Sequence, residues 1–247
     1  MIVILSGEGP TDLGQCNNAQ SICSDEQFQV GPMAVLVDQM LQQLLNYSPR
    51  TIPGVFQYVS ELALKDRESI RKNENRKVSL VGKKRDQETG YFYINAWMLG
   101  DIALERETTC KDKAIAILFR DCDGTRSTKA VLWAAKWKSM VDGFKRSKFT
   151  RGVPMLPKPK SEAWLLCTAK NQAYQGCDKL EDLPGNDDSP NSAKNKLDEA
   201  FGEHKSTVEL CEWLENNPFD VDRASAMPSF KAFQDELGRA LNEILAG

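Results

Sequence analysis

The chain has 247 residues, 41% of them hydrophobic and 27% charged, which fits one large domain or a core with an appended subdomain. No apolar run approaches the roughly 20 residues that span a bilayer, and residues 1–6 are too short for a secretory signal, so we expect a cytoplasmic protein without a membrane segment. Seven scattered cysteines without a C-x-x-C pair predict free thiols and no disulfide framework. A single histidine, His204, excludes a histidine-rich zinc site.

Charge is unevenly distributed behind a net value of −3. Residues 65–85 carry nine Lys or Arg against three acids, and residues 136–160 carry eight against Asp142 alone. Residues 178–222 reverse the sign, with thirteen acids against four lysines. The two basic tracts are the electrostatic footprint expected of a protein that binds a phosphate backbone, although such tracts are also common as solvated helix faces.

Residues 1–6 form a continuous apolar, β-branched run that predicts a buried strand of a parallel sheet, and residues 114–119 repeat the pattern. Strands that alternate with helices predict an α/β fold with a mostly parallel sheet flanked by helices. A polar, Pro- and Gly-containing stretch at 176–190 divides the prediction into a core, 1–175, and a helical C-terminal subdomain, 176–247. The other predicted elements are helices over 32–47, 55–76, 91–106, 128–144 and 161–171, strands over 77–81 and 152–156, and three or four helices within 191–245.

Acidic residues directly follow both buried strands. Glu8 and Asp12 lie in the sequence GEGPTD after the first strand, and Asp121 and Asp123 lie in DCDG after the second. If the strands are neighbours in one parallel sheet, both loops open on the same edge, where ligands of such sheets bind. Converging carboxylates repel one another unless a cation offsets them, and oxygen ligands favour Mg²⁺ or Mn²⁺ over zinc. The sequence therefore predicts a divalent-metal site, although a lone D-x-D-G is also common in turns.

Together the two motifs resemble the Toprim family, whose α/β fold is shared by topoisomerases, bacterial primases and OLD-family nucleases. The resemblance covers roughly residues 1–12 and 114–165 and implies a Rossmann-like core. It implies that Glu8 is a metal ligand or general acid/base, that Asp121 and Asp123 are metal ligands, and that Asp12 marks the second metal position of the OLD-like branch. The long stretch between the motifs predicts a helical insertion at about 50–110.

A third segment, LPKPKSEAWLL at 156–166, resembles the Lys-Pro…Glu-Ala-Trp-Leu segment of small stand-alone bacterial Toprim proteins. Lys158, between two prolines, is a candidate to neutralise charge on the transferred phosphate, with Lys160 as the substitute if Lys158 points away. Glu162 is a candidate metal ligand, although the helix dipole alone also favours an acid in a first helical turn. The candidate nucleic-acid contacts are Lys83, Lys84, Arg85, Arg120, Arg126 and Lys160.

These features predict a Mg²⁺- or Mn²⁺-dependent endonuclease that hydrolyses phosphodiesters in DNA or RNA. The resemblance implies phage defence or DNA repair, with a separate ATPase subunit because the chain has no G-x-x-x-x-G-K-[ST] motif. Three alternatives stay open: primase-like nucleotidyl transfer at the same site, a non-catalytic Toprim-like effector or sensor that binds a partner protein, and a phosphatase-like or receiver-like protein. The sequence leaves open whether the chain forms a homo-oligomer.

Overall fold

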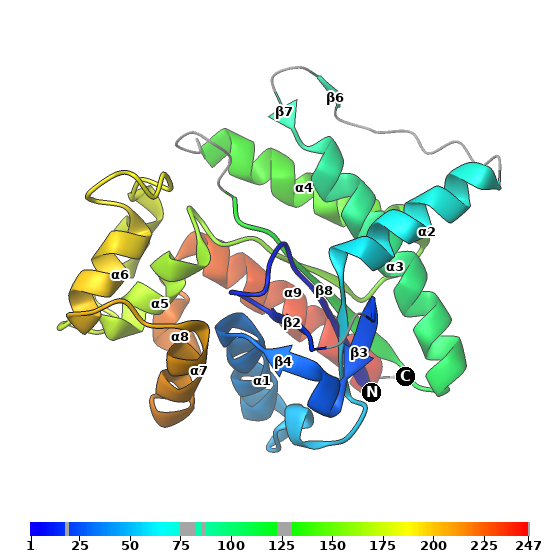
Figure 1. Ribbon diagram of the computed structural model, residues 1–247, viewed down its shortest axis with the longest axis horizontal. Coiled ribbons are helices and arrows are strands. Elements are labelled where there is room, and N and C mark those ends of the chain that lie inside the picture. The colour runs from blue at the N-terminus through cyan, green and yellow to red at the C-terminus, as the bar shows by residue number, and fades with distance from the viewer. Residues whose placement is uncertain (18–19, 75–82, 85–86, 123–129, 247) are drawn as a thin grey trace.

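Helices cover both faces of a five-stranded sheet in the computed structural model, which describes residues 1–17, 20–74, 83–84, 87–122 and 130–246 (Figure 1). The strand order is β3-β5-β1-β8-β9, in which β5, β1, β8 and β9 are parallel and β3 is an antiparallel edge strand. This confirms the predicted α/β class with a mostly parallel sheet. The strands are β1 (Ile2–Ser6), β3 (Ile22–Ser24), β5 (Phe56–Val59), β8 (Ala114–Phe119) and β9 (Gly152–Met155).

Side chains of the central strands alternate between two hydrophobic layers, as the two-residue period of a strand requires. Val3 and Leu5 of β1 pack in one buried cluster, whereas Ile2 and Ile4 pack in the other. Because both faces are covered, the strand is apolar at nearly every position, which explains why it is recognisable in the sequence.

The helices divide between these two layers. One layer packs α1 (Pro32–Leu45), α5 (Ser161–Ala169) and α9 (Pro228–Leu245) against the sheet, and the other packs α2 (Glu61–Asn73), α3 (Gly90–Cys110) and α4 (Ala130–Ser147) (Figure 1). Three shorter helices, α6 (Ala193–Phe201), α7 (Thr207–Asn216) and α8 (Val221–Ala224), gather beside α1 and α5. The small elements are β2 (Gly14–Cys16), β4 (Phe28–Val30), β6 (Lys83–Lys84), β7 (Gln87–Glu88) and the 3₁₀ turns η1 (Asp25–Gln27), η2 (Pro49–Thr51) and η3 (Cys177–Asp182).

The helix predicted over 55–76 is wrong in its first part. Residues 56–59 form β5, which pairs with β1, and α2 begins only at Glu61. Ser60 caps α2, since its side chain accepts a hydrogen bond from the Ala63 N–H at 3.3 Å. The segment 50–110, where an insertion was predicted, thus supplies a strand of the main sheet and the helix α3 that packs on β8. The strand predicted at 77–81 lies outside the described residues.

The C-terminal helices share a hydrophobic core with the sheet. Trp164 of α5 stacks on Phe233 of α9 with ring centroids 5.7 Å apart, and its indole N–H donates to the Ser229 hydroxyl at 2.9 Å. Helix α9 also packs against β9. Residues after 176 therefore complete one face of the sheet and fix the position of α5.

The prediction that all cysteines are free thiols is wrong. Disulfides join Cys16 to Cys23 and Cys167 to Cys177, whereas Cys110, Cys122 and Cys211 are free. Separations of 7 and 10 residues carry no recognised pairing signal, and only the tertiary turns bring these sulfurs together. In the part of the chain that the structure describes, no helix combines the length and the apolar character needed to cross a bilayer.

Candidate metal centre

The parallel pairing of β1 with β8 brings the two acidic loops to one edge of the sheet. Ser6, the last residue of β1, lies opposite Leu118 near the end of β8, so the loops with Glu8 and Asp121 leave the sheet side by side. Strand β9 is parallel to β8 and leads into α5 at the same edge. The three acidic segments singled out in the sequence therefore meet where parallel sheets bind ligands.

Ser161 links the two acidic loops directly. Its hydroxyl donates to Asp12 Oδ1 at 2.5 Å, and its backbone N–H donates to Asp121 Oδ1 at 3.2 Å. Because Ser161 is the first residue of α5, its N–H has no partner within the helix and is available to a carboxylate. One residue thus holds the carboxyl groups of two loops that are far apart in the sequence.

The backbone of Asp12 is held against the start of α1. The Met33 N–H donates to the Asp12 carbonyl at 2.9 Å, and the Gly31 N–H donates to the Leu13 carbonyl at 3.0 Å. A Cβ atom at Gly31 would lie 2.2 Å from the Asp12 carbonyl oxygen, so only glycine permits this approach. The loop that carries Asp12 is therefore positioned by close backbone packing.

Glu8 lies over a buried arginine. Arg120 has no exposed surface, and its Nε lies 3.5 Å from Glu8 Oε1. Its Nη1 donates to the Phe119 carbonyl at 2.9 Å, while Nε and Nη2 make no hydrogen bond in the described structure. A fully buried side chain is not placed to touch a nucleic-acid backbone, for which Arg120 was a candidate, and its position beside Glu8 gives it an electrostatic role under the site.

Burial and mutual repulsion raise the pKa values of these carboxyl groups. Burial is the largest cause of the raised pKa of Asp121, and the charges of Asp12, Glu162 and Glu8 add to it. Burial also raises the pKa of Asp12, Glu8 and Glu162, against the opposing effects of Ser161 on Asp12 and of Arg120 on Glu8. Glu162 Oε2 is buried and makes no hydrogen bond in the described structure. A cation at this edge would relieve each of these costs.

The donor set fits a hard divalent cation in its chemistry, because it consists of carboxylate oxygens and includes the buried, unbonded Glu162 Oε2. Among the described residues, no three His, Cys, Asp or Glu side chains already form a group that could hold a metal ion. Ser161 and Arg120 instead hold the carboxylates as they stand. Asp123, the remaining predicted ligand, lies outside the described residues.

A cavity of about 470 Å³ opens beside these carboxylates. Lys160 lines it, with its Nζ 2.7 Å from Asp187 Oδ1. Lys158 points elsewhere, since its Nζ lies 3.6 Å from Asp182 Oδ1 in η3. The geometry therefore favours Lys160, the predicted substitute, as the lysine of the site.

The remaining candidates for nucleic-acid contact are less defined. Lys83 and Lys84 form β6, which pairs with β7 at the top of Figure 1. Arg85 and Arg126 lie outside the described residues. Residues of the site that were not predicted include Ser161, which its place just before Glu162 at a helix start could have indicated, and Lys194 of α6, which lines the cavity and had no local signal.

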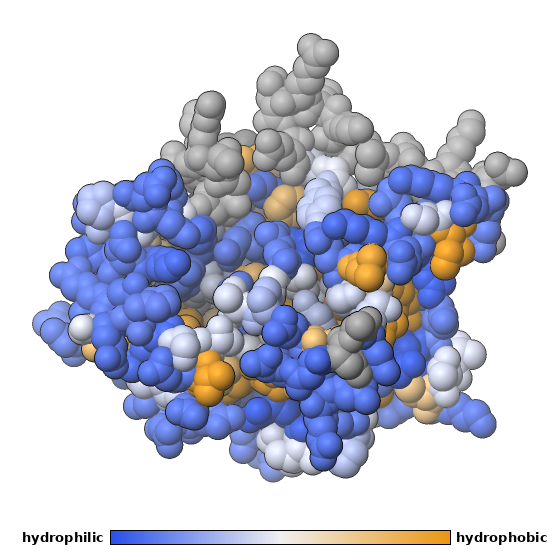
Figure 2. All heavy atoms as spheres, in the orientation of Figure 1, coloured by the Kyte–Doolittle hydropathy of each residue, from blue (hydrophilic) through white to orange (hydrophobic). Residues whose placement is uncertain are grey.

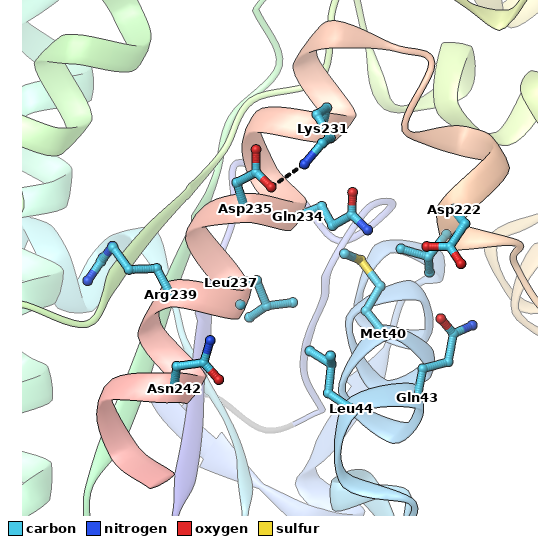
Figure 3. Close-up of a pocket in the computed structure, with 12 residues that line it drawn as sticks. Met40, Gln43, Leu44, Asp222, Lys231, Gln234, Asp235, Leu237, Arg239 and Asn242 are labelled. Atoms are coloured by element: carbon cyan, nitrogen blue, oxygen red, sulfur yellow. Dashed lines mark hydrogen bonds and ion pairs between the residues drawn. The ribbon is translucent and has the colours of Figure 1, made fainter. Parts of the chain in front are cut away.

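A second cavity, of about 600 Å³, lies between α1 and α9, away from the acidic edge (Figure 3). Met40 and Leu44 face it from α1, and Leu237 faces it from α9 (Figure 3). Lys231 and Asp235 pair with each other along α9. Apolar side chains and polar groups of mixed charge line this second cavity. The cavity of about 470 Å³, where carboxylates converge, is therefore the better candidate for a metal site.

Comparison with models of protein families, with curated proteins and with solved structures finds no match for the chain. The structure itself shows an α/β architecture with a mostly parallel sheet. A functional assignment therefore rests on the residues at the acidic edge of this sheet.

Proposed function

We propose that this protein is a divalent-metal-dependent nuclease that hydrolyses phosphodiesters in DNA or RNA. The observation that carries the proposal is the contact of Ser161 with both Asp12 and Asp121, because it joins two acidic motifs of Toprim-like sequence at one sheet edge. Glu8 and Glu162 are close enough to these carboxyls to raise the pKa of Asp121. Clusters of this kind are typical of sites that bind Mg²⁺ or Mn²⁺.

Four described residues would hold the metal: Glu8, Asp12, Asp121 and Glu162, with Asp123 as the further ligand that the motif supplies. A divalent ion, when bound, lowers the pKa of a water molecule and offsets charge on a phosphate. Burial raises the pKa of Glu8 against the opposing effect of Arg120, and a carboxyl with a raised pKa is a better proton acceptor, which suits Glu8 for general acid/base chemistry.

The surrounding residues orient and balance the charges. Ser161 fixes the directions of Asp12 and Asp121 by hydrogen bonds, and the buried Arg120 forms an ion pair with Glu8. Lys160 lines the same cavity and would neutralise charge on the transferred phosphate. Each residue at this edge would thus hold a cation, move a proton, orient a ligand or balance charge.

Incubation of the purified protein with plasmid DNA, single-stranded DNA and tRNA in Mg²⁺ or Mn²⁺ tests the proposal. Glu8→Gln and Asp121→Asn should each lower the cleavage rate by at least about 100-fold, the scale of a lost acid/base or electrostatic contribution. The matched control is Asp188→Asn, which removes the same charge from an exposed residue that does not line the cavity. Loss of bound Mn²⁺ in Asp121→Asn, measured by electron paramagnetic resonance, supplies a second readout.

Undiminished cleavage by both site variants would remove this edge from consideration. Incorporation of nucleotides without fragments would favour primase-like transfer. Nucleic-acid fragments that form only after an ATPase is added would support the separate subunit that the resemblance implies. Absence of cleavage under all these conditions, with Mn²⁺ binding retained, would favour the non-catalytic effector.

A further inference from the structure

The acidic C-terminal region places two of its four lysines in the cavity beside the carboxylates. Residues 178–222 carry thirteen acids and only four lysines. Two of those lysines, Lys194 and Lys205, line the cavity beside Asp12 and Asp121, and so does the chain's one histidine, His204. Two lysines from a region of opposite net charge thus line the candidate site, together with His204 and Asp187 of the same region.

Lys194 is the least neutralised of these cations. It is half-buried on α6, and within the described part of the chain no carboxylate or hydrogen-bond acceptor pairs with it. Lys196, two residues further along the same helix, pairs instead with Glu199 at 2.6 Å. An ammonium group that lines a cavity without a counterion is available to an anionic ligand.

The neighbouring residues Lys205 and His204 are held in place by their own contacts. Lys205 Nζ lies 3.0 Å from Glu203 Oε1 and 5.2 Å from the centre of the Phe201 ring, and its side chain keeps 19% of its surface exposed. His204 Nδ1 lies 3.1 Å from Asp198 Oδ1. These contacts fix the segment between α6 and α7 as the far wall of the cavity.

The shape of the cavity restricts the form of a nucleic-acid ligand. The acidic edge and α5 wall one side, while α6 and the residues before α7 wall the other. Its volume of about 470 Å³ is in the range of pockets that enclose a small ligand. A duplex presents two backbones to an open surface, whereas a walled pocket admits a single strand whose bases are already unstacked. The left of the face in Figure 2, over α6 and its loops, is mostly hydrophilic.

We infer that this cavity takes a single strand of nucleic acid, or a strand end, and that Lys194 binds a backbone phosphate beside the one that is cut. This inference rests on the proposed nuclease function and names its substrate form. Lys205 adds a second positive charge to this wall, and His204 adds a polar group beside it. Asp187 of this region lines the cavity but is paired with Lys160, and the acids that do not line the cavity repel a polyanion from the rest of the region.

The test measures binding of one fluorescent single-stranded oligonucleotide, and of its duplex, by anisotropy in Ca²⁺ at several salt concentrations. We expect the single strand to bind more tightly than the duplex. Lys194→Gln should weaken that binding about fivefold to tenfold at low salt and reduce the salt slope by about 0.7, the value for one lost phosphate contact on a single strand. Lys196→Gln, the control on the same helix, should bind as the wild type does.

Binding and cleavage separate this inference from the proposed function. Binding that depends on Lys194, with no cleavage in Mg²⁺ or Mn²⁺, would sustain the single-strand cavity and refute the nuclease. Cleavage that is unchanged in Lys194→Gln, with unchanged affinity and salt slope, would sustain the nuclease and refute the cavity. Equal losses in Lys194→Gln and Lys196→Gln, or a duplex bound as tightly as the strand, would also overturn the inference.

Discussion

Keeping Asp121 ionised is costly, because its carboxyl is buried among other acidic groups. The charges of Asp12, Glu162 and Glu8 lie near its carboxyl, which accepts a hydrogen bond from the Ser161 N–H. The raised pKa means that the folded state binds the Asp121 proton more tightly than the unfolded state does. Between the usual pKa of 3.8 and the raised value, the folded protein carries more bound protons than the unfolded one, so its stability falls as pH rises through that window.

We predict that Asp121→Asn is more stable than the wild type at neutral pH when no divalent metal is present, because the amide carries no charge to repel its neighbours. Thermal unfolding in a chelator from about pH 4 to about pH 8 measures the effect, and the variant should lose less stability across that range. Added Mn²⁺ should raise the melting temperature of the wild type more than that of the variant. Identical pH profiles would show that Asp121 does not carry this cost.

The sequence indicated the acidic residues of the site but not the residues around them, such as Ser161 and Lys194. Glu8, Asp12 and Asp121 could be chosen because each closely follows a run of buried strand residues, and strand ends are where parallel sheets hold ligands. Ser161 and Lys194 act through contacts with residues distant in the chain, which no local pattern encodes. Arg120 shows the reverse case, since a cation beside a motif turned out to be completely buried.

At the scale of the element, the loop between β1 and β2 is shaped by its contact with the start of α1. Gly31→Ala would place a methyl group 2.2 Å from the Asp12 carbonyl, so one of the two backbones must move. We expect a loss of stability of about 1–3 kcal/mol, the usual cost of such overpacking, together with weaker Mn²⁺ binding because Asp12 shifts.

The control for this variant is Gly238→Ala on α9, where no atom lies within 4 Å of an added Cβ. Alanine is the better helix former, so this change should keep or raise stability by up to about 1 kcal/mol. Chemical denaturation and Mn²⁺ titration of both variants make the comparison. Equal behaviour of the two would show that the Gly31 contact does not position Asp12.

The helices could be predicted from the sequence, whereas the strands that are defined by their pairing with other strands could not. Residues 32–45 are helical as their apolar spacing indicated, and the helices predicted at 91–106 and 161–171 are present as α3 and α5 with shifted ends. Residues 56–59 form β5 because a place beside β1 is open to them, a tertiary reason that overrides the local pattern. The small strands β2, β3 and β4 lie between residues 7 and 31, where no strand was predicted, and they are defined by pairing of β2 with β4 and of β3 with β5.

At the scale of the molecule, α5 is fixed by a closed set of contacts with the C-terminal helices. The disulfide Cys167–Cys177 ties the end of α5 to η3. Glu181 of η3 accepts a hydrogen bond from the Ser229 N–H at 2.7 Å, and the Ser229 hydroxyl accepts one from Trp164 of α5. The start of α5 carries Ser161, so the C-terminal helices determine where the two acidic loops meet.

Removal of this disulfide tests that arrangement. The double variant Cys167→Ala, Cys177→Ala should lower the free energy of unfolding by about 2–3 kcal/mol, because the unfolded chain gains the freedom of a short loop. It should also weaken Mn²⁺ binding, since α5 holds Ser161 less rigidly. Cys110→Ala, at an exposed free cysteine, is the control and should change neither quantity. Thiol titration of the denatured wild type should find three free cysteines without reductant, Cys110, Cys122 and Cys211, and all seven after reduction. A count of seven without reductant would refute both disulfides, and with them the reason for expecting the double variant to be less stable.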